Sequence, residues 1–447
     1  MEGAILPPAM FDQQDTKGND MNEFDKIIGY EAIKQELMQI SDVLKNSEAY
    51  VKLGVKPPCG LLLYGDPGVG KSLMASALIE ASGRKAFTCR KDKPDGEFVG
   101  QITATFEAAK AAAPAIVFLD DMDKFANGDP DHTDAEEYVT VQSCIDDSKG
   151  TDVFVLATVN NMRCLPRSLR RVGRFDRTIE VENPSGKDAE KIIAHYISEK
   201  KFVGNIYART IARLMNGRSC AELETVINEA GIYAGYERSP EITMDHFMKA
   251  ILHTVFDVPI GQIAAFASEK NNNPEFERIA YHEAGHAVIG EVMDPGSVTL
   301  VSAYAQEGER GGFTHCWEAD DAPALESAER HIIRALGGAA ASEQIFGSFD
   351  VGCPHDLDQA FDAVWNLVTN NCTCGFHLHC NGSDSEELKA KQEQAVAAEV
   401  ERYYRKAKDI LAQNKDLLEG IAQGLLQKGV LTAVDIAEIR KGCRKAA

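Results

Sequence analysis

The chain has 447 residues, 44% of them hydrophobic and 26% charged, which is the composition of a globular protein with about three domains. Its formal net charge of −22 argues against nonspecific nucleic-acid binding, because phosphate contacts need clustered cations. The eleven cysteines are an odd number spread over a long chain. They argue against a disulfide framework and fit a reduced intracellular protein.

The first residues carry no targeting or membrane signal. Residues 1–23 are polar and acidic, without the basic and apolar regions of a signal peptide, so we expect a flexible tail. The sequence contains no run of about 18 apolar residues and therefore predicts no membrane span. An amphipathic helix is predicted next, from apolar residues at helical spacing: Ile33, Leu37, Ile40 and Leu44.

A glycine-rich loop lies between a predicted strand at 61–64 and a predicted helix at 73–81. It matches the P-loop pattern G-x-x-x-x-G-K-S with Gly65, Asp66, Pro67, Gly68, Val69, Gly70, Lys71 and Ser72. In this context the backbone N–H groups wrap phosphates, Lys71 reaches the β- and γ-phosphates, and the Ser72 hydroxyl binds Mg²⁺. The loop therefore predicts ATP with Mg²⁺ as the ligand; a plain glycine-rich turn is the weaker alternative.

Polar residues follow two further apolar strands. The run at 116–119 ends in Asp120 and Asp121, and the run at 153–157 leads to Asn160. We expect Asp120 to hold Mg²⁺ through water and Asp121 to polarise the attacking water. Strands that alternate with helical patterns predict a parallel sheet covered by helices.

Residues 170–177 read R-R-V-G-R-F-D-R. One interpretation is a solvated basic surface. The other is an arginine finger that reaches the γ-phosphate bound by a neighbouring subunit.

A second motif, H-E-x-x-H, lies in the predicted helix 275–293. His282 and His286 are four residues apart, so they share one helix face and can hold zinc. Glu283 can then take a proton from a water molecule. The alternative is an amphipathic helix with two chance histidines. Val292 stands where the metzincin pattern has a third histidine, so a third ligand must come from elsewhere.

Two acidic residues are candidates for the third ligand, Glu343 and Asp356. A separate cluster of soft ligands matches no common zinc-finger spacing, and we interpret it as fortuitous: Cys372, Cys374, His377, His379 and Cys380.

Together these motifs resemble the FtsH family of AAA zinc proteases, from about residue 24 to about residue 440. The resemblance implies an α/β AAA+ ATPase, with helices on both faces of a parallel sheet and a small helical lid, followed by a mostly α-helical zinc peptidase domain. It places the large ATPase subdomain at 24–184, the lid at 185–257 and the peptidase at 258–447.

The resemblance also implies roles for single residues of the ATPase. Asn160 is the sensor asparagine, and Arg174 is the preferred arginine finger, with Arg171 second. His195 lies in a segment that packs against the nucleotide, and the turn at 217–223 is near the adenine.

Two further roles come from the same resemblance. Phe98, Val99 and Gly100 match the pore-loop F-V-G, whose aromatic residue grips substrate in the central channel of a ring. Asp356 lies in a stretch similar to the family's G-A-S-N-D segment, whose aspartate binds zinc. It is therefore the preferred third ligand, and Glu343 is left with a supporting or helix-surface role.

The expected function is an ATP-dependent zinc endopeptidase that threads protein substrates through the pore of a homo-hexamer. We expect no nucleic-acid partner and a cytoplasmic location. Family members are membrane-anchored, with the catalytic part facing the cytoplasm, so membrane association would need a segment absent from this chain.

Two departures from the family define the alternatives. Asp121 replaces a glutamate, and the stretch between the F-V-G at 98–100 and Phe106 is about one helical turn short. These departures would suit a nucleotide-binding remodelling or chaperone protein with weak ATP turnover. A further alternative is an ATP-independent peptidase with a regulatory ATPase relic.

Overall fold

The structure is a computed structural model, which describes residues 22–126, 135–266, 274–307, 311–317, 324–348, 354–379 and 385–446. The chain divides into two compact units. The first contains Met1–Pro184 and Ser219–Ala221, and the second contains Ser185–Arg218 and Glu222–Ala447. Among the described residues, no helix has both the length and the apolar character needed to span a bilayer.

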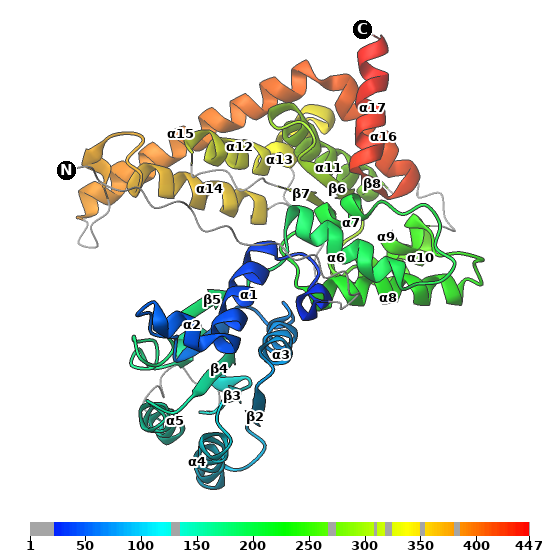
Figure 1. Ribbon diagram of the computed structural model, residues 1–447. Helices are drawn as coiled ribbons and strands as arrows, with labels where there is room; N and C mark the ends of the chain where they lie inside the picture. The colour runs from blue at the N-terminus through cyan, green and yellow to red at the C-terminus, as the bar shows by residue number, and fades with distance from the viewer. Residues whose placement is uncertain are drawn as a thin grey trace, which may run out of the picture. The chain divides into compact units, whose positions relative to one another are not determined.

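The first unit is built on a five-stranded parallel sheet in the order β2-β3-β4-β1-β5 (Figure 1). Its strands are β1 (Gly60–Tyr64), β2 (Lys85–Cys89), β3 (Ala115–Leu119), β4 (Val153–Val159) and β5 (Arg177–Glu180). Its helices are η1 (Glu23–Lys26), α1 (Glu31–Lys45), α2 (Ser47–Lys52), α3 (Lys71–Ser82), α4 (Asp95–Ala111), η2 (Met122–Lys124), α5 (Glu136–Asp147) and η3 (Met162–Cys164).

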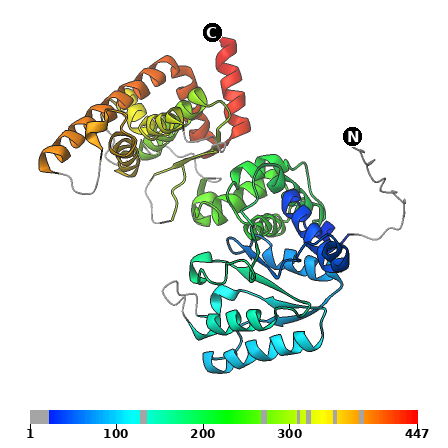
Figure 2. The ribbon, with the colours of Figure 1, turned by 60° about the vertical axis from the view of Figure 1, so that its left-hand side comes forward.

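Both faces of this sheet are buried, because alternate side chains of a strand point to opposite faces. Leu61 and Leu63 of β1 join a core with α1 and α3, whereas Leu62 joins a second core with α4 and α5. Helices therefore cover both faces, as Figure 2 shows for this unit. The α/β class predicted from the sequence is confirmed.

The second unit begins with helices α6 (Gly186–Ser198), α7 (Ala208–Leu214), α8 (Cys220–Tyr236), α9 (Met244–Thr254) and α10 (Ile260–Phe266). The remaining helices are α11 (Pro274–Met293), α12 (Leu325–Ala335), α13 (Gly337–Phe346), α14 (Pro354–Thr369), η4 (Phe376–Leu378), α15 (Glu386–Gln413), α16 (Lys415–Lys428) and α17 (Ala433–Ala446). A small antiparallel sheet, in the order β7-β6-β8, completes the unit with β6 (Val298–Ser302), β7 (Phe313–Cys316) and β8 (Val430–Thr432).

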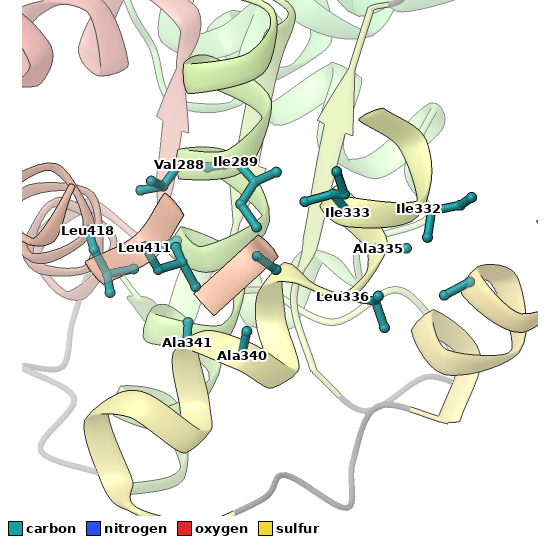
Figure 3. Close-up of a cluster of buried hydrophobic side chains, with 14 of the residues drawn as sticks. Val288, Ile289, Ile332, Ile333, Ala335, Leu336, Ala340, Ala341, Leu411 and Leu418 are labelled. Atoms are coloured by element: carbon teal, nitrogen blue, oxygen red, sulfur yellow. The ribbon is translucent and has the colours of Figure 1, made fainter. Parts of the chain in front are cut away.

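Helix α11 lies at the centre of the largest core of this unit. Val288 and Ile289 of α11 pack there with Ile333 of α12, Ala341 of α13 and Leu418 of α16 (Figure 3). The core thus joins helices that are far apart in the sequence and fixes α11, which carries the H-E-x-x-H motif. The predicted helical character of this part of the chain is confirmed.

The structure contradicts the role expected for Phe98. This residue is not on an exposed loop but in α4, where its side chain is 0% exposed. Its ring packs edge-on against Phe125, with 4.8 Å between the ring centroids. Ile102 and Phe106 continue the same buried stripe at helical spacing. The segment at 98–100 is therefore part of a core helix, and Phe98 cannot grip substrate without leaving that core.

Replacement of Phe98 by alanine is expected to destabilise the first unit by about 3–5 kcal/mol, the usual loss for a phenylalanine buried in a core. Differential scanning calorimetry would show this as a lower unfolding temperature for that unit. Phe376→Ala is the control, since Phe376 is 89% exposed. An unchanged unfolding temperature for Phe98→Ala, together with lost degradation of substrate, would restore the pore-loop role.

Candidate nucleotide and zinc sites

The predicted P-loop connects β1 to α3 at the carboxyl edge of the sheet. Lys71, the first residue of α3, folds back and donates hydrogen bonds to the carbonyls of Gly65 at 2.8 Å and Asp66 at 2.7 Å. Gly70 has a φ of +99°, which L side chains rarely adopt, and a Cβ there would meet no atom within 4 Å. The loop thus has the open backbone cradle that a phosphate chain needs.

Two other segments support the P-loop. The backbone N–H of Ala221 donates to the carbonyl of Gly68 at 3.1 Å, so the segment 219–221 reaches the loop. Asn183 donates to the carboxylate of Asp66 at 3.1 Å. Val69 is buried in the core of the first unit.

The acidic residues after β3 lie next to the P-loop. Asp120 Oδ1 accepts a hydrogen bond from Thr158 at 2.8 Å and lies 3.5 Å from the Ser72 hydroxyl. Asp121 Oδ1 accepts a hydrogen bond from the Asn160 amide at 3.3 Å. Since β1, β4 and β3 are neighbours in the sheet, the residues that follow them meet at one edge.

Oxygen donors of this kind fit a magnesium-bound nucleotide. The Ser72 hydroxyl and the Asp120 carboxylate are hard ligands of the type that Mg²⁺ prefers. The open space at Gly70 leaves room for phosphates. The structure therefore brings together the P-loop, Asp120, Asp121 and Asn160 as the sequence predicts.

Two cations contact the acidic pair, and no sequence pattern predicts either contact. Arg90 Nη2 lies 2.7 Å from Asp120 Oδ2 and 3.8 Å from the nearer carboxylate oxygen of Asp121. Lys124 Nζ lies 2.7 Å from Asp121 Oδ2. Burial raises the pKa of Asp121, but the hydrogen bond and charge of Lys124, the amide of Asn160 and the charge of Arg90 outweigh it, so the net shift is downward.

The two arginine-finger candidates differ in their surroundings. The Arg174 guanidinium donates to both carboxylate oxygens of Asp146, at 3.2 and 2.7 Å, and to the carbonyl of Ser168 at 2.6 Å. The hydrogen bond from Arg174 is the main reason that the pKa of Asp146 is lowered to about 2. Arg171, in contrast, is exposed beside Val172, which is 96% exposed. The structure therefore favours Arg171 over Arg174 as a residue available to a neighbour.

His195 lies on α6 of the second unit. Its Nε2 atom is 3.6 Å from Oε1 of Glu199, the residue that follows the helix, and its side chain is 44% exposed. The nucleotide-binding role that the resemblance implies for His195 stays a prediction.

The three predicted zinc ligands come together in the second unit. Asp356 Oδ2, at the start of α14, lies 3.0 Å from His282 Nε2 and 3.3 Å from His286 Nε2. The two Nε2 atoms are 3.1 Å apart. Among the described residues, these three form the one group of histidine, cysteine or acidic side chains close enough to share a metal ion.

The chemistry and spacing of this group fit zinc. In a tetrahedral site with bonds of about 2.0–2.1 Å, ligand atoms lie about 3.3 Å apart, close to the spacing found here. His286 Nδ1 is 2.7 Å from the backbone carbonyl of Arg334 and must donate to it, which leaves Nε2 as the ligand atom. The two histidines lower the pKa of Asp356 despite its burial, so it is ionised.

Glu283 is buried beside the histidines, and burial raises the pKa of its carboxyl. Its Oε2 atom accepts a hydrogen bond from the Thr314 hydroxyl at 2.8 Å. Thr314 lies on β7, which the sequence did not predict, and so its role was missed. A lone threonine in a short strand gives no signal of this contact in the sequence.

Gly338 was also missed, although the two histidines depend on it. A Cβ at this position of α13 would lie 2.3 Å from His282 Nε2 and 2.5 Å from His286 Nε2. Only a hydrogen atom fits between α13 and the two ligand atoms. The G-G pair at 337–338 was visible in the sequence, but nothing near it pointed to the histidines.

The other candidate ligands lie apart from this group. Glu343 accepts a hydrogen bond from Tyr404 at 2.6 Å and pairs with Lys408 at 3.0 Å, so it has the helix-surface role expected for it. Cys372 Sγ is 3.8 Å from His379 Nδ1. Cys380, also predicted to be part of a fortuitous cluster, lies outside the described residues.

Replacement of Gly338 by alanine is expected to lower zinc affinity by about 10- to 100-fold, as changes around metal ligands usually do. The added methyl group would push the two imidazoles apart, while alanine favours the helix itself, so the fold should persist. Zinc content after dialysis, measured by atomic emission, tests this. Gly261→Ala is the control, because a Cβ at Gly261 meets nothing within 4 Å. Full zinc content in Gly338→Ala would contradict the assigned site.

Comparison with known proteins finds two family models, one over each part of the chain that carries a candidate site. The model of the ATPase family associated with various cellular activities (AAA) matches residues 61–183, and that of peptidase family M41 matches residues 270–439. ATP-dependent zinc metalloprotease FtsH 2 of Thermoanaerobacter sp. is 29% identical over 444 residues, which are 95% of this chain and 84% of that protein. FtsH 4 of Synechocystis sp. is 30% identical over 447 residues, with coverages of 92% and 70%. FtsH of Ureaplasma parvum is 30% identical over 431 residues, with coverages of 90% and 58%. The chain therefore belongs to the FtsH family of ATP-dependent zinc metalloproteases.

Proposed function

We propose that this protein is an ATP-dependent zinc endopeptidase that cleaves polypeptides, with His282, His286 and Asp356 as the zinc ligands. The observation that carries the proposal is their geometry: three ligand atoms within hydrogen-bonding distance of one another, beside a buried glutamate. Family membership supports the same activity.

The peptidase residues have separate tasks. When bound, zinc supplies Lewis-acid chemistry, which polarises a peptide carbonyl and makes water easier to deprotonate. Glu283 takes the proton from water on its carboxylate and passes it to the amine that leaves. Burial suits it to this task, because a raised pKa makes a carboxylate a better base. Thr314 fixes the orientation of that carboxylate.

In the ATPase, the loop at 65–70 and Lys71 would hold the phosphates, and Ser72 and Asp120 would hold the magnesium ion that neutralises phosphate charge. Asp121 would orient the attacking water, with Asn160 as its partner. We assign the large subdomain to 24–184, the lid to 185–257 and the peptidase to 258–447.

We place the active form in a ring of identical subunits, a hexamer in the cytoplasm, with Arg171 reaching the nucleotide of its neighbour. The assembly is supported by the exposure of Arg171 and of the apolar Val172 beside it. Arg174 would instead stabilise this segment through its ion pair with Asp146. We assign Phe98 no part in moving the substrate, because its side chain is buried in the core.

Glu283→Gln is expected to lower casein cleavage by about 10²- to 10⁴-fold, the usual contribution of a general acid–base residue. Zinc content and ATP turnover should be retained, since glutamine keeps the shape of the side chain. Glu277→Gln, an exposed residue of the same helix, is the matched control. Cleavage at the parent rate by Glu283→Gln would refute the zinc-protease assignment.

The dependence on ATP is tested with the parent protein. Casein degradation is compared with ATP, with a non-hydrolysable analogue and after chelation of zinc. Casein cleavage is expected only in the sample that has ATP and retains its zinc. Equal cleavage with the analogue, without ATP turnover, would identify an ATP-independent peptidase. ATP turnover without cleavage would identify a remodelling protein.

Arg171→Ala is expected to lower ATP turnover by about 10³-fold, the lower end of the range for arginine fingers, with nucleotide affinity unchanged. Arg163→Ala removes an equal charge from another exposed site and should have little effect. The measurement is steady-state ATP hydrolysis at protein concentrations where subunits assemble. A loss in Arg163→Ala of the same size would show that the effect is not specific to Arg171.

A further inference from the structure

The acidic pair of the nucleotide site is fully occupied by side chains of its own unit. Asp120 Oδ1 accepts from Thr158, and Asp120 Oδ2 pairs with Arg90. Asp121 Oδ1 accepts from Asn160, while Asp121 Oδ2 pairs with Lys124. Each of the four carboxylate oxygens thus has a partner, and two positive charges balance two negative ones.

Arg90 and Lys124 reach this pair from different segments. Arg90 follows β2, in the segment that leads to α4, and Lys124 ends η2. Their side chains are 63% and 61% exposed, whereas that of Asp120 is only 10% exposed. The cations are therefore free to move into solvent, but the Asp120 carboxylate is fixed in place.

This arrangement bears directly on metal binding. A magnesium ion or its water shell needs a carboxylate oxygen of Asp120, and Oδ1 is already turned toward Thr158 and Ser72. Arg90 holds the other oxygen. A second positive charge that approaches Asp120 is repelled by the guanidinium, and solvent weakens this repulsion because the Arg90 side chain is largely exposed.

We propose that Arg90 is a displaceable cation on the Asp120 carboxylate, paired with Oδ2 beside the Oδ1 atom that faces Ser72, so that metal–nucleotide binding competes with the Arg90–Asp120 ion pair. Lys124 holds Asp121 in the same resting arrangement. The inference rests on the proposed ATPase function. It assigns to Arg90 a role in setting the metal concentration at which the site is half-saturated.

The test measures metal binding directly, with Mn²⁺ in place of Mg²⁺ and a non-hydrolysable ATP analogue. Free Mn²⁺ is followed by electron paramagnetic resonance as it is titrated into the intact chain. Arg90→Gln should lower the Mn²⁺ concentration at half-saturation by about 1.5- to 5-fold, the effect expected from loss of one exposed ion pair. The difference should shrink at high salt, which screens exposed charges.

Lys93→Gln is the matched control, because Lys93 is an exposed cation of the same segment. Its half-saturation should stay at the parent value. An equal shift in both variants would show that the effect comes from the change in net charge, and it would overturn the proposal. No shift, or weaker Mn²⁺ binding, in Arg90→Gln would also overturn it. If the parent binds no analogue at any Mn²⁺ concentration, the proposed ATPase function itself fails.

Discussion

The close approach of α11 to α13 is the constraint on which the zinc site depends. A Cβ at Gly285 would lie 2.4 Å from the carbonyl oxygen of Gly337, and one at Gly337 would lie 2.9 Å from that of Gly285. The two helix backbones therefore touch, which is possible only where side chains are absent. This contact brings Gly338 against His282 and His286, so larger residues at the crossing would move the ligands as well as the helices.

The features that could be predicted from the sequence are those that local spacing determines. The P-loop at 65–72 lies between a strand and a helix, and His282 and His286 share a face because four residues make about one turn. The third zinc ligand could not be predicted from spacing. Spacing did not decide between Glu343 and Asp356, and only the resemblance to a family favoured Asp356. The structure brings Asp356 to the histidines across 74 residues, by a packing of α14 that no local pattern encodes.

Phe98 shows how a short motif can mislead. The letters F-V-G suggested an exposed loop, yet Phe98, Ile102, Phe106 and Ala109 recur at helical spacing and are all buried. Periodicity over about three turns was the stronger signal, because burial of an apolar stripe stabilises a helix along its whole length. The contacts of Thr314 and Arg90 are of another kind. Both are made between separate segments, and neither residue type has a spacing that marks such a contact.

The two carboxylates assigned to water activation are held in opposite ways. Glu283 is buried and receives a hydrogen bond from a neutral hydroxyl, so its pKa is raised. Asp121 contacts the ammonium group of Lys124, and its pKa is lowered. A neutral hydroxyl orients a carboxylate without adding an opposite charge beside it. A cation stabilises the ionised carboxylate and makes that carboxylate a weaker base. The peptidase site is thus arranged for proton transfer as it stands. In the ATPase site, the proposed displacement of Arg90 from Asp120 would couple the chemistry to the arrival of a metal-bound nucleotide.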